Sequence, residues 1–170
     1  MATMNYHNIL HCNMNNGPGL RVVLFVSGCN HHCKGCQNPQ TWRPNSGIPF
    51  DEDALNEIFD ELSKDYCQGI TLTGGDPLFP DNRETIKQLC ESIKILYPTK
   101  DIFLYTGYVW EELIQQDDIR EILQYIDILA DGKFEIDKLS PDKHWVGSSN
   151  QRVIDVQKSL KDNKIILADC

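Results

Sequence analysis

Residues 21–36 read RVVLFVSGCNHHCKGC, an apolar run that is followed at once by three cysteines. The apolar part, residues 21–26, comes after the turn residues Gly17, Pro18 and Gly19. A short run without polar alternation is typical of a strand that is buried on both faces, as in a parallel sheet. This stretch therefore predicts a buried strand that ends in a cysteine-rich loop.

Outward from this stretch, candidate strands and helices alternate along the chain. Further strands are expected at residues 69–73, 101–105, 126–130, 152–156 and 164–167. Helices are expected at 52–64 and 82–96, at 110–125 with a break near 116–117, and between the last two strands. Asp51 is a suitable N-cap for the first helix, whose expected apolar face is Leu55, Ile58, Phe59 and Leu62. For the second helix the expected apolar face is Ile86, Leu89, Cys90 and Ile93. This alternation indicates βαβ units with right-handed crossovers and a mostly parallel sheet.

The length of the chain limits the fold that these units can build. A closed eight-stranded β/α barrel takes about 250 residues, whereas this chain has 170. We therefore expect an α/β fold, a partial, open β/α barrel of about four to six parallel strands. No repeat, low-complexity tract or long linker interrupts the sequence, so residues 1–170 are expected to form a single domain.

Composition and charge narrow the classes of partner. The chain carries 16 Lys and Arg against 25 Asp and Glu, a net charge of −9, without a local basic patch. Such an acidic protein repels phosphate backbones, so nucleic acid is not expected as a partner. No apolar run approaches the roughly 20 residues of a membrane span, and the N-terminus lacks the pattern of a signal peptide. We expect a cytoplasmic protein that does not enter a membrane.

Seven cysteines in a cytoplasmic chain point to metal or redox chemistry before disulfides. Cys12, Cys67, Cys90 and Cys170 are isolated and are interpreted as small buried residues or surface thiols. The other three, Cys29, Cys33 and Cys36, form one C-x3-C-x2-C cluster. The chemistry of the chain is therefore expected at this cluster.

Turn segments follow several of the expected strands. They are Ser27-Gly28-Cys29, Thr73-Gly74-Gly75-Asp76, Thr106-Gly107 and Ala130-Asp131-Gly132. In parallel α/β folds the C-terminal ends of the strands share one edge, and ligands bind there. These segments are expected to converge on one pocket beside the cysteine loop.

Two metals fit the cysteine cluster to different degrees. A structural zinc site needs four ligands, usually from two separated pairs, and a fourth ligand from His31 or His32 would crowd the same tight turn. A [4Fe-4S] cluster uses thiolate ligands, and three of them leave one iron open for a substrate. The spacing therefore favours the iron–sulfur cluster, with zinc as the alternative.

These residues carry a resemblance to a known superfamily. The C-x3-C-x2-C loop after the first strand, with Gly74-Gly75-Asp76-Pro77 after the second, resembles the radical S-adenosylmethionine (radical SAM) enzymes. Further stretches narrow this resemblance from the superfamily to one family. They are residues 17–21, 35–38 with Thr41-Trp42, 72–78, 105–113 and 147–152. Over roughly residues 17 to 160 the chain is similar to the family that activates anaerobic (class III) ribonucleoside-triphosphate reductases.

The resemblance implies a mechanism and its partners. The open iron would bind S-adenosylmethionine (SAM) and an electron from the cluster would cleave it to methionine and a 5′-deoxyadenosyl radical. This radical would remove hydrogen from a glycine of the partner reductase and leave a glycyl radical. A flavodoxin-type protein is implied as the electron donor.

The resemblance also assigns roles to individual residues. Cys29, Cys33 and Cys36 are the implied iron ligands, and Gly35, Cys36 and Gln37 are placed near the adenine of SAM. Gly74, Gly75 and Asp76 correspond to the segment that contacts the methionine part, with Asp76 shorter than the glutamate usual there. Thr106 and Asp131 are weaker candidates for the polar groups of SAM, or else turn or capping residues. His31 and His32 are interpreted as surface residues or as hydrogen-bonding neighbours of the cluster, and residues 148–152 as a family feature without an assigned chemistry.

Two alternatives remain open at this point. One is an activator of another glycyl-radical enzyme, such as pyruvate formate-lyase. The other is a zinc-stabilised interaction module without catalysis, which the iron, sulfide and zinc content of the protein would separate from a cluster enzyme.

Overall fold

A sheet in the order β3-β1-β2-β4-β5-β6-β7 organises the computed structural model, which describes residues 4–170. The strands are β1 (Asn5–Asn13), β2 (Leu20–Val26), β3 (Ile48–Pro49), β4 (Cys67–Gly74), β5 (Asp101–Tyr105), β6 (Ile128–Asp131) and β7 (Arg152–Asp155). The four central strands, β2, β4, β5 and β6, run parallel to one another. Strand β1 is antiparallel to both β2 and β3, and β7 is antiparallel to β6. The sheet is therefore mixed, and it is not closed.

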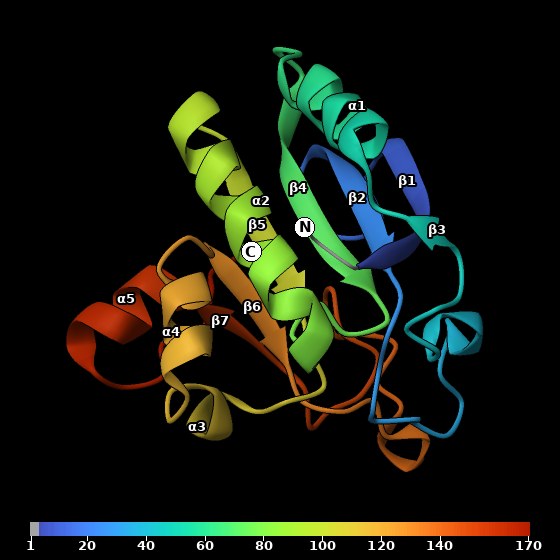
Figure 1. The fold of residues 1–170 in the computed structure, drawn as a ribbon. Helices are drawn as coiled ribbons and strands as arrows, with labels where there is room; N and C mark the ends of the chain where they lie inside the picture. The colour runs from blue at the N-terminus through green and yellow to red at the C-terminus, as the bar shows by residue number, and fades with distance from the viewer. Residues whose placement is uncertain (1–3) are drawn as a thin grey trace.

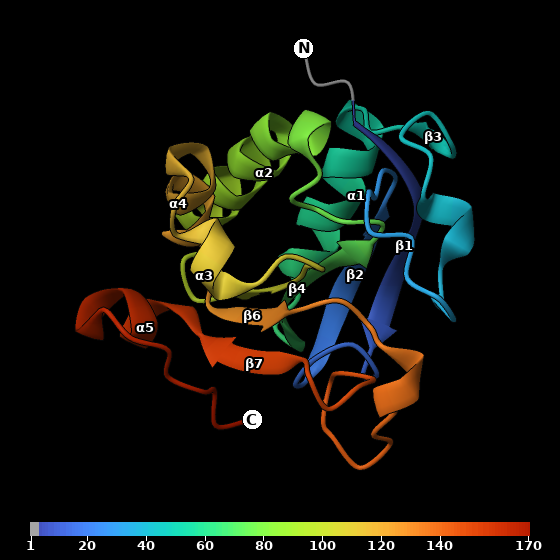
Figure 2. The same ribbon diagram turned by 90° about the horizontal axis from the view of Figure 1, so that it is seen from below.

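Helices cover one face of the sheet, and all but the last lie on connections between strands (Figures 1 and 2). They are α1 (Glu52–Leu62), α2 (Arg83–Leu96), α3 (Trp110–Leu113), α4 (Asp117–Leu123) and α5 (Val156–Asp162), with short 3-10 turns η1 (Pro39–Thr41), η2 (Pro80–Asn82) and η3 (Ile136–Lys138). The Asp51 carboxylate accepts from the Ala54 amide at 3.0 Å and caps α1, as expected. Helix α2 and the break between α3 and α4 also confirm the sequence pattern.

Side chains alternate between the two faces of the sheet, and the centre of each face is buried. One row of aligned residues, Leu24, Leu72, Leu104, Leu129 and Ile154, is fully buried in the main core cluster, together with helix residues such as Ile58 and Ile93. The opposite face carries Val23, Thr71 and Phe103, which are fully buried as well. The prediction that residues 21–26 form a strand buried on both faces is thus confirmed for most of its length.

Several expectations from the sequence need correction. Strands β1 and β3 were not expected, and β7 is antiparallel, so the parallel part of the sheet stops at β6. Residues 164–167 do not form a strand; Leu167 makes an isolated bridge to Ile154 and is largely exposed. The mostly parallel α/β architecture therefore holds for the centre of the sheet and not for its edges.

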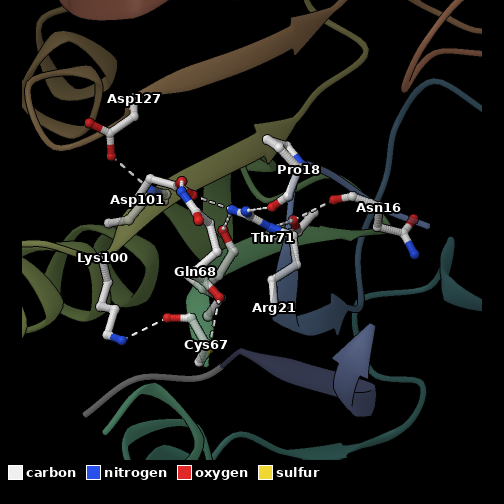
Figure 3. A network of polar contacts seen from close by, with 12 residues as sticks. Asn16, Pro18, Arg21, Cys67, Gln68, Thr71, Lys100, Asp101 and Asp127 are labelled. Carbon is white, nitrogen blue, oxygen red and sulfur yellow. Dashed lines mark hydrogen bonds and ion pairs between the residues drawn. The ribbon is translucent and has the colours of Figure 1, made fainter. Parts of the chain in front are cut away.

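A buried arginine lies at the start of β2, at the end of this strand away from the cysteines (Figure 3). Arg21 is fully buried and donates to Thr71 Oγ1 at 2.8 Å, to the Pro18 carbonyl at 2.6 Å and to the Ile70 carbonyl at 3.0 Å. Its remaining partner is the Asp101 carboxylate at the start of β5. This network ties the loop before β2 to the middle of β4 and to the first residue of β5.

In the part of the chain that the structure describes, no helix is long and apolar enough to cross a membrane.

Candidate metal centre

The cysteine loop begins where β2 ends, and main-chain bonds fix both of its sides. The Gly28 amide donates to the Thr41 carbonyl at 2.7 Å and the Cys29 amide to the Trp42 carbonyl at 3.0 Å. On the other side, the Asp76 amide donates to the Gly28 carbonyl at 2.7 Å. Cys29 is therefore held at the C-terminal edge of the sheet, where the sequence placed it.

Main-chain amides lie near the three sulfurs. The Asn38 amide donates to Cys36 Sγ at 3.3 Å. The main chain at His31 and His32 acts to lower the pKa of the Cys29 thiol, and the main chain at Phe134 acts to lower that of Cys33. Hydrogen bonds from amides stabilise thiolates and are one of the factors that set the potential of an iron–sulfur cluster.

Burial opposes the ionisation of two of these thiols in the metal-free protein. It raises the pKa of the Cys29 thiol to about 11 and also raises that of Cys33, although the main chain near them acts in the opposite direction. A bound metal deprotonates its thiol ligands outright, so loading of the site releases protons. Metal loading would therefore have to overcome the raised pKa of Cys29 and Cys33.

Gly74 and Gly75 lie against the end of β2. A Cβ on Gly75 would lie 2.6 Å from the Gly28 carbonyl oxygen, and one on Gly74 would lie 2.7 Å from the Val26 amide nitrogen. Gly74 also has a φ of +101°. These glycines allow β4 to pass close to the start of the cysteine loop, a packing role that stands beside the contact with SAM expected from the resemblance.

Asp76 is 2% exposed and collects hydrogen bonds from three segments. Its Oδ2 accepts from His31 Nε2 at 2.7 Å, from Thr106 Oγ1 at 2.9 Å and from the Gly107 amide at 2.9 Å. Its Oδ1 accepts from the Leu78 amide at 2.9 Å. The carboxylate therefore joins the cysteine loop to the ends of β4 and β5.

Asp131 is also occupied by neighbours within the protein. It is 1% exposed, caps α3 by accepting from the Trp110 amide at 2.8 Å, and forms a two-pronged ion pair with the Arg152 guanidinium. Of the two interpretations left open for Asp131, the capping role is the one that the contacts describe.

Residues 132–151, which we call the strap, connect β6 to β7 and lie beside the cysteine loop (Figure 2). Gln151 Oε1 accepts from the Gly147 and Ser148 amides at 3.0 Å each, and its Nε2 donates to the Gly132 carbonyl at 3.0 Å. The Ser148 hydroxyl accepts from the Glu135 amide at 3.1 Å. The polar segment 148–152 thus has a structural role, since it holds the strap in its fold.

Two cavities flank the strap at this edge of the sheet. One, of about 510 Å³, is lined by His31 and Cys33 of the cysteine loop, Gly107, residues 132–135 and Asn150. The other, of about 360 Å³, is lined by Gln37, Asn38 and strap residues, with Thr73 and Tyr105 from the strands. Phe134 lines both cavities.

The convergence expected from the strand ends is present in part, because bonds of Asp76 join it to Gly28, Thr106 and Gly107. Of the residues expected beside SAM, Gln37 lines the smaller cavity, and Gly35, Cys36, Gly74, Gly75 and Asp76 line neither. Gly107 and Gly132 line the larger cavity, one position after the expected Thr106 and Asp131. Lys133 and His31 also line it and were not assigned as binding residues from the sequence. Lys133 directly follows Asp131-Gly132, so the rule that ligands bind at strand ends was a signal for it.

Within residues 4–170, no three His, Cys, Asp or Glu side chains converge closely enough to hold a single metal ion. His32 stacks on Trp42 with ring centroids 4.5 Å apart, and His31 bonds Asp76. Both candidates for the fourth zinc ligand, His31 and His32, thus have other partners in this structure.

Comparison with known proteins gives concordant matches. Residues 15–154 match the model of a 4Fe-4S single cluster domain. The chain is 49% identical over 150 residues to the anaerobic ribonucleoside-triphosphate reductase-activating protein of Enterobacteria phage T4. The aligned region covers 88% of this chain and 93% of the relative. The chain is 45% identical over 152 residues to the protein of the same name from Escherichia coli K12, with 88% and 97% covered. The sequence, the cysteine loop and these matches together show that the chain belongs to the family of anaerobic ribonucleoside-triphosphate reductase-activating proteins, oxidoreductase-type enzymes with a 4Fe-4S domain.

Proposed function

We propose that this chain binds one [4Fe-4S] cluster through Cys29, Cys33 and Cys36 and activates an anaerobic ribonucleoside-triphosphate reductase by SAM-dependent formation of a glycyl radical. The observation that carries the proposal is the single loop of three thiols, which the Gly28 and Cys29 amides fix at the strand edge beside a cavity of about 510 Å³. When bound, the cluster supplies the electron for cleavage of SAM to methionine and the 5′-deoxyadenosyl radical that abstracts hydrogen from the partner's glycine.

The residues around the cavity suit the charges of SAM. Lys133 offers an ammonium group to a carboxylate, and Glu112 and Glu135 offer carboxylates to an amino group or a sulfonium. A cavity of this size is in the range of small-molecule and cofactor sites. Gly35, Cys36, Gln37, Gly74 and Gly75 remain the proposed neighbours of SAM.

Asp76, Thr106 and Asp131 complete the proposed SAM site. Their side chains already bond to other parts of the protein, and through these bonds they position Gly107 and Gly132, which line the cavity.

The proposal includes the architecture and the partners. The open sheet, with β2, β4, β5 and β6 parallel, is proposed as a partial barrel of the radical SAM type within one domain of residues 1–170. An open side suits a protein substrate, because the partner's glycine must be delivered as a loop. The names of the relatives favour the reductase over other glycyl-radical enzymes as the partner. A flavodoxin-type electron donor follows from the family resemblance.

The test is metal analysis of anaerobically prepared protein, followed by an assay of SAM cleavage. We expect about four iron and four sulfide per chain, and 5′-deoxyadenosine when SAM and a reductant are added. Cys36→Ala is expected to lose both, whereas Cys170→Ser, at an exposed cysteine outside the loop, keeps both. Stoichiometric zinc without sulfide, or undiminished 5′-deoxyadenosine from Cys36→Ala, would contradict the proposal.

A further inference from the structure

His31 lies in the sequence between two proposed iron ligands, Cys29 and Cys33, and its side chain contacts Asp76 and Tyr108. The side chain is only 7% exposed, and its Nε2 lies 2.7 Å from Asp76 Oδ2. The next residue, His32, has a φ of +48° and stacks on Trp42 instead. Two adjacent histidines of one loop are therefore directed to different parts of the protein.

The surroundings of His31 are shaped to receive its ring. The ring packs edge-on against Tyr108, with centroids 4.6 Å apart and an interplanar angle of 77°. Gly107 lies so close that a Cβ there would be 2.4 Å from His31 Cδ2. A side chain at position 107 would thus displace the imidazole from Asp76.

The Asp76 end of this contact is rigid. The carboxylate has three further donors, from Thr106, Gly107 and Leu78, on the ends of β5 and β4. A carboxylate held in this way gives His31 a fixed anchor in a buried setting, where charge-assisted hydrogen bonds are strong. Apart from the main-chain amides at the cysteine sulfurs, the contact between His31 and Asp76 is the one side-chain hydrogen bond between residues 29–36 and another segment of the described chain.

We propose that His31 is a positioning residue, which holds Cys29 and Cys33 in place for the cluster through its hydrogen bond to Asp76. The role rests on the proposed ligation by these cysteines. The loop is tied at Gly28 and Cys29 by main-chain bonds, so His31 fixes the part that those bonds do not reach. Groups that orient the ligands of a metal site typically change metal affinity by 10- to 100-fold when they are removed.

The experiment compares His31→Leu, which removes the donor, with His31→Gln, whose amide nitrogen can reach Asp76. His11→Leu is the matched control, because it makes the same substitution at another histidine that bonds carboxylates, outside the cysteine loop. The first readout is the rate at which the reconstituted protein loses iron to a chelator. We expect His31→Leu to lose iron about tenfold faster than wild type, and His31→Gln and His11→Leu to stay close to wild type.

The second readout uses the metal-free protein and does not depend on the cluster. The rates of alkylation of Cys29 and Cys33 by iodoacetamide, followed by mass spectrometry, are expected to rise about tenfold in His31→Leu and to recover in His31→Gln. If His31→Leu fails to fold, His31→Asn replaces it, because its amide is too short to reach Asp76. Wild-type rates in both readouts for the variant without the donor, or an equal effect from His11→Leu, would overturn the proposal.

These readouts separate this role from the proposed function. SAM cleavage can fail while iron retention still depends on His31, in which case the proposed function falls and the positioning role stands. If SAM cleavage is found while the rates of iron loss and alkylation do not depend on His31, the proposed function stands and the positioning role falls.

Discussion

Removal of the Asp101 carboxylate is expected to destabilise the fold without damaging the cysteine loop. Arg21 is fully buried, and Asp101 carries the charge that compensates it (Figure 3). In Asp101→Ala the guanidinium keeps neutral acceptors, namely Thr71 Oγ1 and the Pro18 and Ile70 carbonyls. It is left without a counter-ion in a site that water does not reach.

The size of the effect follows from the burial of both groups. Loss of one partner of a buried ion pair costs about 3–5 kcal/mol. The Asp101 side chain is 20% exposed, which favours the lower end, about 3 kcal/mol. For a chain of this size that corresponds to a melting temperature lower by about 6–12 °C.

The assay is urea unfolding of the metal-free protein followed by circular dichroism. Asp101→Asn, which keeps an acceptor for the guanidinium, is expected to lose less than Asp101→Ala. The double variant Arg21→Met/Asp101→Ala is expected to be more stable than Asp101→Ala alone, since it leaves no buried charge. Iron binding at low temperature should persist, because Arg21 and Cys29 lie at opposite ends of β2. An Asp101→Ala protein within about 1 kcal/mol of wild type would refute this reasoning.

Further predictions concern the loop, the strap and an exposed histidine. Gly75→Ala is expected to lower stability by about 1–3 kcal/mol, because the new Cβ would meet the Gly28 carbonyl oxygen at 2.6 Å; an unchanged melting temperature would contradict this. Gln151→Ala removes the bonds that close the strap, so hydrogen exchange is expected to accelerate in residues 133–149 and not in β2 or β4; uniform exchange would contradict this. A hydrogen bond to Glu57 raises the pKa of His11 against the effect of burial, and Glu61 adds to the rise. The linked stability is therefore present below about pH 6.5 and is lost as the pH rises through the folded-state pKa. His11→Gln should flatten this fall in the free energy of unfolding between about pH 6 and pH 8, and an unaltered pH profile would argue against the assignment.

The central part of the fold was readable from local patterns. Apolar runs and helix periodicity located β2, β4, β5, α1 and α2 because tertiary packing here agrees with local preference. Strand β1 was missed because its nine residues, NYHNILHCN, are mostly polar and poor strand formers, and its pairing depends on the exposed edge of β2. The direction of β7 was also hidden, since periodicity does not report strand polarity. The lack of a helical pattern in residues 132–151 was the available signal, because a parallel connection usually carries a helix.

In the candidate site, too, local sequence patterns were readable and contacts between distant residues were not. The spacing alone indicated Cys29, Cys33 and Cys36 as candidate ligands, because three thiols within eight residues belong to one loop. The bonds between His31 and Asp76 and between Asp131 and Arg152 join residues 45 and 21 positions apart. Sequence separation of this kind hides which polar side chains are free and which already have partners.

The most direct test of the central claim is electron paramagnetic resonance of the anaerobic reductase after incubation with this protein, SAM and a reductant. A parallel sample with pyruvate formate-lyase serves as the control for partner choice. The account predicts a glycyl radical signal on the reductase that requires SAM and is lost with Cys29→Ala. A reductase that shows no glycyl radical signal dependent on this protein, while the protein carries its cluster, would contradict it.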